Sequence, residues 1–209
     1  MRKKIFIAFI LLIAVFVSSC SPGENLSTET EYGGAKGILA NNDVVDFYFY
    51  YPPDFTLDKN AAMISVYIGD QEIVRTDITG SVDPTAESGA SDNTYAIAVN
   101  PNISATVFTL SDNSGGTPQE YWDITALPML ERTFADFKLI ATEDAVVDEC
   151  EAKIFTYEGN IAGIAYKYAQ AVFVNKGQVY TLTYTSSPAK FEDYSSALEM
   201  AVNTFKFKQ

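Results

Sequence analysis

The pattern of apolar and polar positions divides the chain into three parts. Residues 5–17 are continuously apolar, residues 21–37 are rich in Ser, Thr, Gly and Glu, and the rest contains short apolar runs separated by turn residues. Short runs rich in β-branched and aromatic residues predict strands. We therefore expect a leader over residues 1–19, a flexible tether over residues 20–40 and one folded domain over residues 41–209.

Strands are predicted along most of this domain. The run from Val44 to Tyr51 is the clearest, and Pro52-Pro53 ends it because proline has no N–H for a strand ladder. Further strand-like runs cover residues 61–70, 71–78, 95–100, 105–110, 138–147, 150–159, 161–177 and 178–186. The polar segment 80–93 is long for a loop in a compact domain, which predicts a mobile segment or a contact surface.

The last two strand runs flank Asn175-Lys176-Gly177, which predicts a tight hairpin with Gly177 in the left-handed conformation. A slip of one residue in its register would reverse the side chains that face the core. The pattern therefore leaves open which tyrosines are buried among Tyr166, Tyr168, Tyr180 and Tyr184.

Two segments have helical signals. Thr117-Pro118-Gln119-Glu120 is a capping box with proline at the first helical position, and Pro128 should kink or divide the helix that follows. We expect that helix to bury Trp122 and one face formed by Tyr121, Ile124, Met129 and Phe134. A second helix is predicted from Ser187-Pro188, with Phe191, Tyr194, Leu198, Ala201 and Phe205 at helical spacing. Mostly consecutive strands with helices in the middle and at the end predict an α+β domain, an antiparallel sheet flanked by helices.

The leader has the features of an export signal. Arg2, Lys3 and Lys4 precede the apolar run, and small residues follow it. At 1.5 Å per residue the run spans roughly 20 Å of a hydrocarbon core about 30 Å thick, which disfavours a permanent transmembrane helix.

The end of the leader, Val17-Ser18-Ser19-Cys20, resembles the lipobox of bacterial lipoproteins. The resemblance implies that Cys20 is the lipid attachment site, which anchors the chain to the extracytoplasmic face of the cell membrane. An ordinary signal peptide that ends near a cysteine is the alternative.

The composition removes several kinds of chemistry. Histidine is absent, which excludes Ser-His-Asp and Cys-His catalysis and His-ligated metals. The net charge of −13 disfavours nucleic acid as a partner and favours cationic partners or divalent ions, although solubility alone also explains it.

With Cys20 acylated, Cys150 has no disulfide partner. Glu149 and Glu151 beside it should raise its thiol pKa, which predicts an inert, partly buried residue.

Three pieces of the domain resemble the PsbP-like family. They are a strand that runs into Tyr51, Pro52 and Phe55, a hairpin strand with Tyr180, Leu182 and Tyr184, and a closing helix that ends at Thr204 and Phe205. The resemblance covers residues 43–208, with Phe55 and Thr204 in place of the usual Trp and Ser. It implies an α/β/α sandwich that binds other proteins and carries out no catalysis, with no cofactor. Fold analogy alone names no partner.

Other patterns suggest sites that the sequence supports less well. Five acidic residues, Glu143, Asp144, Asp148, Glu149 and Glu151, could supply an acid–base pair for glycoside hydrolysis, but solvated strand ends and a turn explain them better. The segment from Asp112 to Asp123 fails the EF-hand pattern, because Thr117 stands where glycine is needed, so a turn before a capped helix is favoured over a calcium loop. The 13 tyrosines favour a core role over an exposed binding face.

These observations favour a membrane-tethered, non-enzymatic module that binds or helps to assemble an envelope protein, with no catalytic, metal or cofactor residue. Two alternatives stay open: a carboxylate-based hydrolase that acts on envelope polymers, and a binder of divalent cations.

Overall fold

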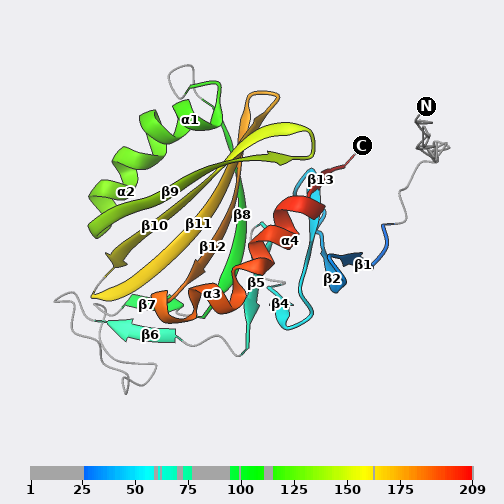
Figure 1. Ribbon diagram of the computed structural model, residues 1–209, viewed down its shortest axis with the longest axis horizontal. Coiled ribbons are helices and arrows are strands. Elements are labelled where there is room, and N and C mark those ends of the chain that lie inside the picture. Colours follow the sequence, from blue (N-terminus) through cyan, green and yellow to red (C-terminus); the bar gives the residue numbers. More distant parts are fainter. Residues whose placement is uncertain are drawn as a thin grey trace, which may run out of the picture.

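The computed structural model describes residues 26–208, apart from residues 59–60, 62, 70–72, 77–94, 99, 111–114 and 162. A seven-stranded antiparallel sheet of order β4-β5-β8-β12-β11-β10-β9 dominates it (Figure 1). Its strands are β4 (Phe55–Leu57), β5 (Ser65–Ile68), β8 (Asn102–Thr109), β9 (Ala135–Val147), β10 (Cys150–Ile161), β11 (Ile164–Asn175) and β12 (Gln178–Ser186). The export signal, Cys20 and the polar segment 80–93 lie outside the described residues.

Two smaller sheets complete the described strands. The first has the order β1-β2-β3-β13, formed by β1 (Glu29–Tyr32), β2 (Ala35–Ala40), β3 (Phe47–Tyr51) and β13 (Lys206–Phe207). The second pairs β6 (Ile73–Thr76) with β7 (Tyr95–Ala98). The part of the predicted tether between residues 29 and 40 is therefore not a coil. It forms a hairpin on Gly33 and Gly34, both with positive φ, and β2 pairs with β3.

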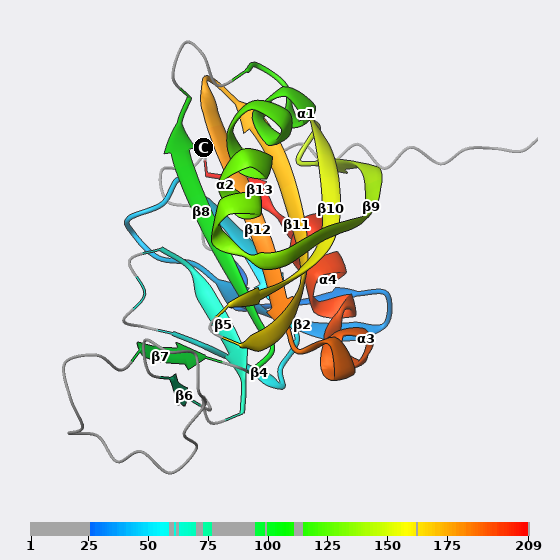
Figure 2. The ribbon, with the colours of Figure 1, turned by 90° about the vertical axis from the view of Figure 1, so that its left-hand side faces the viewer.

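Helices lie on both faces of the large sheet (Figures 1 and 2). One face carries α1 (Pro118–Tyr121), the π-helical segment η1 (Trp122–Ala126) and α2 (Leu127–Thr133). The other carries η2 (Pro188–Lys190), α3 (Phe191–Tyr194) and α4 (Ser196–Thr204), together with the β1-β2-β3-β13 sheet. These helices are short, so the predicted α/β/α sandwich is confirmed only in part and the domain is mostly antiparallel sheet. Within the described ranges, no helix is long and apolar enough to cross a membrane.

The β11–β12 hairpin settles the register that the sequence left open. Asn175 pairs with Gln178 across a two-residue turn in which Lys176 and Gly177 both have positive φ, as a type I′ turn requires. The left-handed conformation predicted for Gly177 is confirmed. All four tyrosines are buried, two on each face: Tyr166 and Tyr168 on the α1–α2 side, Tyr180 and Tyr184 on the α4 side. Both faces of the large sheet are covered, so the side chains that alternate along these two strands are buried on either face.

The capping box at the start of α1 is confirmed. The Glu120 N–H donates to the Thr117 hydroxyl at 3.2 Å, and the Glu120 carboxylate accepts from the Gly116 and Thr117 N–H groups at 2.8 and 3.1 Å. These donors hold the pKa of the Glu120 carboxyl below its ordinary value.

The predicted buried face of this helix is wrong at two positions. Tyr121 and Phe134 are buried, but Ile124 and Met129 are 55% and 50% exposed. The cause is the π-helical turn, in which the Leu127 N–H donates to the Trp122 carbonyl, an i→i+5 bond. The wider turn aligns the buried residues at intervals of four, and Pro128 lies in the first turn of α2. The buried row is Trp122, Ala126, Leu130 and Phe134.

The second predicted helix is divided at Ser195, between α3 and α4, and its predicted buried face is largely confirmed. Phe191, Leu198, Ala201 and Phe205 are buried, and Tyr194 is half-buried. At its end, the Thr204 hydroxyl accepts from the Tyr50 N–H at 2.9 Å, which ties α4 to β3. Phe205 stacks on Phe47 beside that tie, so the closing helix and the strand before Tyr51-Pro52 share one core.

Candidate binding surfaces

Strand β9 is an edge of the large sheet. It is hydrogen-bonded to β10 on one side, and none of the other described strands pairs with its outer side (Figure 2). It is 13 residues long, and Leu139, Ile140 and Val146 are 41%, 44% and 67% exposed. The pairing with β10 shifts at Ile140, between Leu139 and Ala141. A long edge strand with exposed apolar side chains presents free backbone donors and acceptors to another extended chain.

The five acidic residues that the sequence singled out lie around the β9–β10 turn, as the favoured interpretation predicted. Asp148 and Glu149 form the turn, both with positive φ. The Asp148 carboxylate accepts from the Phe207 N–H at 2.9 Å and pairs with Lys206, so the acid ties the turn to the last strand. Asp144 pairs with Lys153 on β10 at 2.6 Å.

Only one of the five acids lines a described cavity. Glu143 and Glu199 both border a hollow of about 490 Å³ between α4 and strands β9–β11. Glu199 also accepts a hydrogen bond from the Tyr32 hydroxyl at 3.3 Å. Over the part of the chain that the structure describes, no group of three or more acidic or cysteine side chains is arranged to hold a metal ion.

Cys150 opens strand β10 and is half-buried. Burial raises the pKa of its thiol, and the charges of Asp148 and Glu149 raise it further. The predicted direction is therefore confirmed, with burial as the larger cause and Asp148 in place of Glu151. A thiol held in its protonated form is a weak nucleophile.

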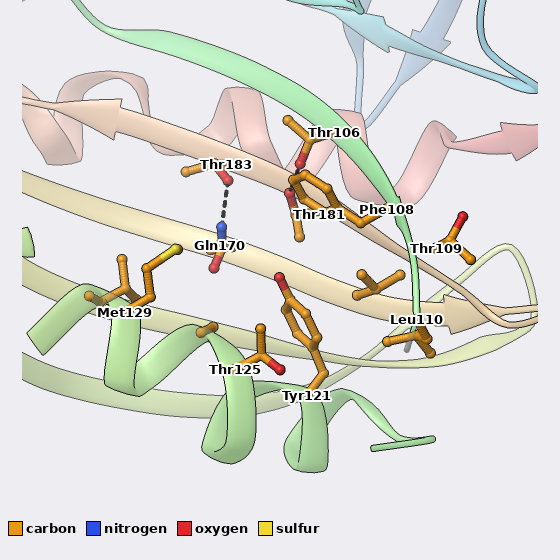
Figure 3. A pocket seen from close by; sticks show the side chains of 13 residues that line it. Thr106, Phe108, Thr109, Leu110, Tyr121, Thr125, Met129, Gln170, Thr181 and Thr183 are labelled. Atoms are coloured by element: carbon orange, nitrogen blue, oxygen red, sulfur yellow. Dashed lines mark hydrogen bonds between the residues drawn. The ribbon is translucent and has the colours of Figure 1, made fainter. Parts of the chain in front are cut away.

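A groove of about 410 Å³ lies between the α1–α2 segment and strands β8, β11 and β12 (Figure 3). Most of its walls are apolar, and Phe108 on β8 and Met129 on α2 are about half exposed at it. Thirteen side chains line it, and none of them is charged: Thr106, Phe108, Thr109, Leu110, Tyr121, Thr125, Ala126, Met129, Leu130, Gln170, Val179, Thr181 and Thr183.

The floor of this groove follows from the alternation along β12. Tyr180, Leu182 and Tyr184 point to the α4 side, which leaves Val179, Thr181 and Thr183 on the opposite face. Thr181 pairs in register with Thr106 of β8, and their hydroxyls are hydrogen-bonded at 2.6 Å. The Gln170 amide donates to the Thr183 hydroxyl at 2.8 Å (Figure 3).

Sequence reasoning missed this groove. The signal was the threonine at every second position in "TLTYT", which marks one polar face on β12, and Thr106 of β8 pairs with that face at Thr181. That these strands are neighbours, and that the helix leaves their threonine face partly open, depends on pairing between segments more than 70 residues apart.

The sequence matches no protein-family model and no curated protein. Among solved structures, the fold is similar to cyanobacterial PsbP (CyanoP) from Synechocystis, with a TM-score of 0.50, 12% identity, and coverage of 91% of this chain and 98% of that one. The chain has a PsbP-like fold. LpqN of Mycobacterium tuberculosis, described as involved in cell envelope biogenesis, is similar at a TM-score of 0.52 and 12% identity, over 87% of this chain and 90% of LpqN.

The PsbP-like fold accounts for the residues on which the sequence resemblance rested. Tyr51, Phe55, Tyr180, Leu182, Tyr184 and Phe205 all belong to the core cluster on the α4 side. They specify how the two sheets and the closing helix pack, so they identify a fold and carry no site. At 12% identity the likeness extends to the fold alone, because one fold hosts many functions.

Proposed function

We propose that this protein is a lipoprotein anchored through Cys20 to the extracytoplasmic face of the cell membrane, where its PsbP-like domain binds an envelope protein without catalysing a reaction. The charged, apolar and small residues before Cys20 support export and acylation. Only residues 21–28 lie between Cys20 and the start of β1 at Glu29, and this short segment holds the domain close to the membrane surface.

The observation that carries the binding role is the exposed edge strand β9. An extended segment of a partner can add to its outer edge through main-chain hydrogen bonds, with Leu139, Ile140 and Val146 as apolar contacts. The shift in pairing at Ile140 alters the local twist of the strand, which limits uncontrolled pairing of edges.

The charge around β9 specifies the kind of partner. The strand carries Asp136, Glu143 and Asp144 against Lys138, and the turn adds Asp148 and Glu149. Lys153 and Lys206 offset Asp144 and Asp148 only. A partner segment with lysine or arginine beside its apolar residues complements this edge, and the attraction should weaken as salt increases.

The absence of catalysis is part of the proposal. Without histidine, catalysis would have to use carboxylates, Lys, Tyr or Ser, and Glu143 with Glu199 is the carboxylate pair that borders a described hollow. The Asp144 carboxylate forms an ion pair with a lysine. The Asp148 carboxylate also pairs with a lysine, and it accepts a hydrogen bond from the Phe207 N–H. Hydrolysis of envelope polymers by Glu143 and Glu199 stays an alternative, and loss of such an activity in a Glu143→Gln variant would favour it.

Photo-cross-linking in native membranes tests the proposed edge. A photoreactive phenylalanine analogue at Ile140 should yield one dominant protein adduct. The same analogue at Glu131, an exposed position on α2, should not. Equal adducts from both positions, or adducts from Glu131 alone, would count against β9 as the docking edge.

The anchor needs a separate test. Metabolic labelling with an alkyne-bearing fatty acid should mark the wild-type chain, and Cys20→Ala should remove the label. A label that persists in Cys20→Ala would place the lipid elsewhere, and an unlabelled wild-type chain would remove the anchor from the proposal without affecting the cross-link at Ile140.

A further inference from the structure

The groove between α1–α2 and strands β8, β11 and β12 is distinct from the docking edge, because none of its thirteen lining residues belongs to β9. Its volume of about 410 Å³ lies within the range of about 300–1,000 Å³ that is usual for small-ligand sites. One fifth of the chain is charged, yet no charged side chain among the described residues lines the groove. An ionised ligand would lose its hydration there without gaining a counter-charge.

Tyr121 supplies a hydrogen-bonding group that is left over. Its side chain is 9% exposed, and Figure 3 shows the hydroxyl directed from the helix toward strands β11 and β12. Among the described residues, this hydroxyl has no hydrogen-bond partner, whereas Thr106, Thr181, Thr183 and Gln170 satisfy one another. The Tyr121 hydroxyl faces the groove and is free to hydrogen-bond a molecule that enters it.

The ionisation state of Tyr121 fixes what it can offer. Burial raises the pKa of its phenol above the ordinary value near 10, so the group stays protonated at neutral pH. It is therefore available as a hydrogen-bond donor, and a carbonyl or ester oxygen is the matching acceptor.

We infer that this groove binds an uncharged acyl ester, with the acyl chain against Phe108, Leu110 and Met129 and the ester oxygen hydrogen-bonded to the Tyr121 hydroxyl. The apolar walls contact the chain, and none of the described lining residues carries a positive charge to pair with the corresponding fatty-acid anion. Such a ligand is either a single-chain ester that exchanges through water or one chain of a membrane lipid. This binding is a second function, independent of the protein partner at β9.

Photoaffinity labelling tests the inference on the full chain in membranes. The probe is a monoacylglycerol with a diazirine in its twelve-carbon acyl chain, a length chosen as roughly that of a drug-sized ligand. We expect its adducts to map to Phe108, Leu110 or Met129, and to be displaced by unlabelled monolaurin but not by laurate. A diacylglycerol probe labels the same residues only if a membrane lipid can deliver one chain.

Variants make the outcome decisive. Tyr121→Phe keeps the ring and removes the hydroxyl, which should weaken labelling about fivefold, the equivalent of one neutral hydrogen bond. Met129→Glu, at a half-exposed position where a charge does not threaten folding, should abolish it. Tyr194→Phe, on the opposite face, should leave it unchanged. Labelling outside the groove, equal displacement by laurate, or no effect of Tyr121→Phe would each overturn the inference, whatever the cross-linking at Ile140 gives.

Discussion

Trp122 stacks face to face on Phe155, with ring centroids 3.9 Å apart and ring planes 4° from parallel. Both side chains are almost fully buried, and they join the π-helical segment to the centre of β10. The contact fixes the helix over one part of the sheet and leaves the threonine face of β8 and β12 open beside it.

Removal of this contact should be costly. Trp122→Ala is expected to lower the free energy of unfolding by about 3–5 kcal/mol, through lost burial and the cavity that remains. Ile124→Ala, in the same helical segment but exposed, should change it by less than about 0.5 kcal/mol. Denaturant unfolding followed by circular dichroism measures both, and similar losses in the two variants would refute the assigned packing.

Gly159 is required by the close approach of Phe134. A Cβ built on Gly159 would lie 2.6 Å from the Phe134 Cβ and 2.7 Å from its Cγ, so Phe134 would have to shift. Gly159→Ala should therefore destabilise the domain by about 1–3 kcal/mol. Gly177→Asn, at the open hairpin turn where a left-handed residue suffices, is the matched control and should cost less. An unfolding midpoint in Gly159→Ala equal to that of the wild type would contradict the contact.

The cap of α1 should give a pH-dependent stability. The pKa of Glu120 is lowered in the folded chain, so its contribution is present above the ordinary carboxyl pKa and is lost as the pH falls through the lowered value. The difference in stability between the wild type and Glu120→Gln should therefore shrink in acid. Unfolding curves at several pH values test this, and a difference that grows as the pH falls would contradict the cap.

The same cap can be tested at its other partner. Thr117→Ala removes the hydroxyl that accepts the Glu120 N–H, and should cost about 1 kcal/mol. Thr117→Ser retains the acceptor and should cost much less. Equal effects of the two substitutions on the unfolding midpoint would show that the hydroxyl does not cap the helix.

The buried tyrosines predict a loss of stability in alkali. Burial raises the pKa of Tyr166 and Tyr184 to about 12, against about 10 in an unfolded chain. Their contribution is complete below pH 10 and is lost as the pH rises toward 12, because the unfolded chain releases these protons first. Absorbance of tyrosinate should therefore rise together with unfolding. Full ionisation of the tyrosines near pH 10 while the far-ultraviolet circular dichroism stays native would refute their burial.

Features set by neighbouring residues were predictable from the sequence. The capping box at Thr117 and Glu120 and the left-handed Gly177 each depend on a few adjacent residues, and both are present in the structure. The closing helix was predictable because its apolar spacing is regular, although its break at Ser195 was not.

Features that depend on distant contacts were not predictable. The hairpin at residues 29–40 has a polar, glycine-rich sequence and is ordered by pairing with β3. The π-helical turn places Trp122 against Phe155, where the two rings stack. With this turn in place, Ile124 and Met129 point toward solvent instead of the core. The groove requires β8 beside β12 and the helix across them, and the edge position of β9 follows only from the order of the whole sheet.

The most direct test of the tethered binding module is the recovery of its partner from solubilised native membranes. Wild-type chain and an Ile140→Lys variant are compared, with Glu131→Lys as the surface control that adds an equal positive charge. We expect one dominant partner, retained by Glu131→Lys, and strongly reduced by Ile140→Lys, which removes an apolar contact and opposes a basic segment. Equal recovery with both variants would contradict the assignment of β9 as the docking edge.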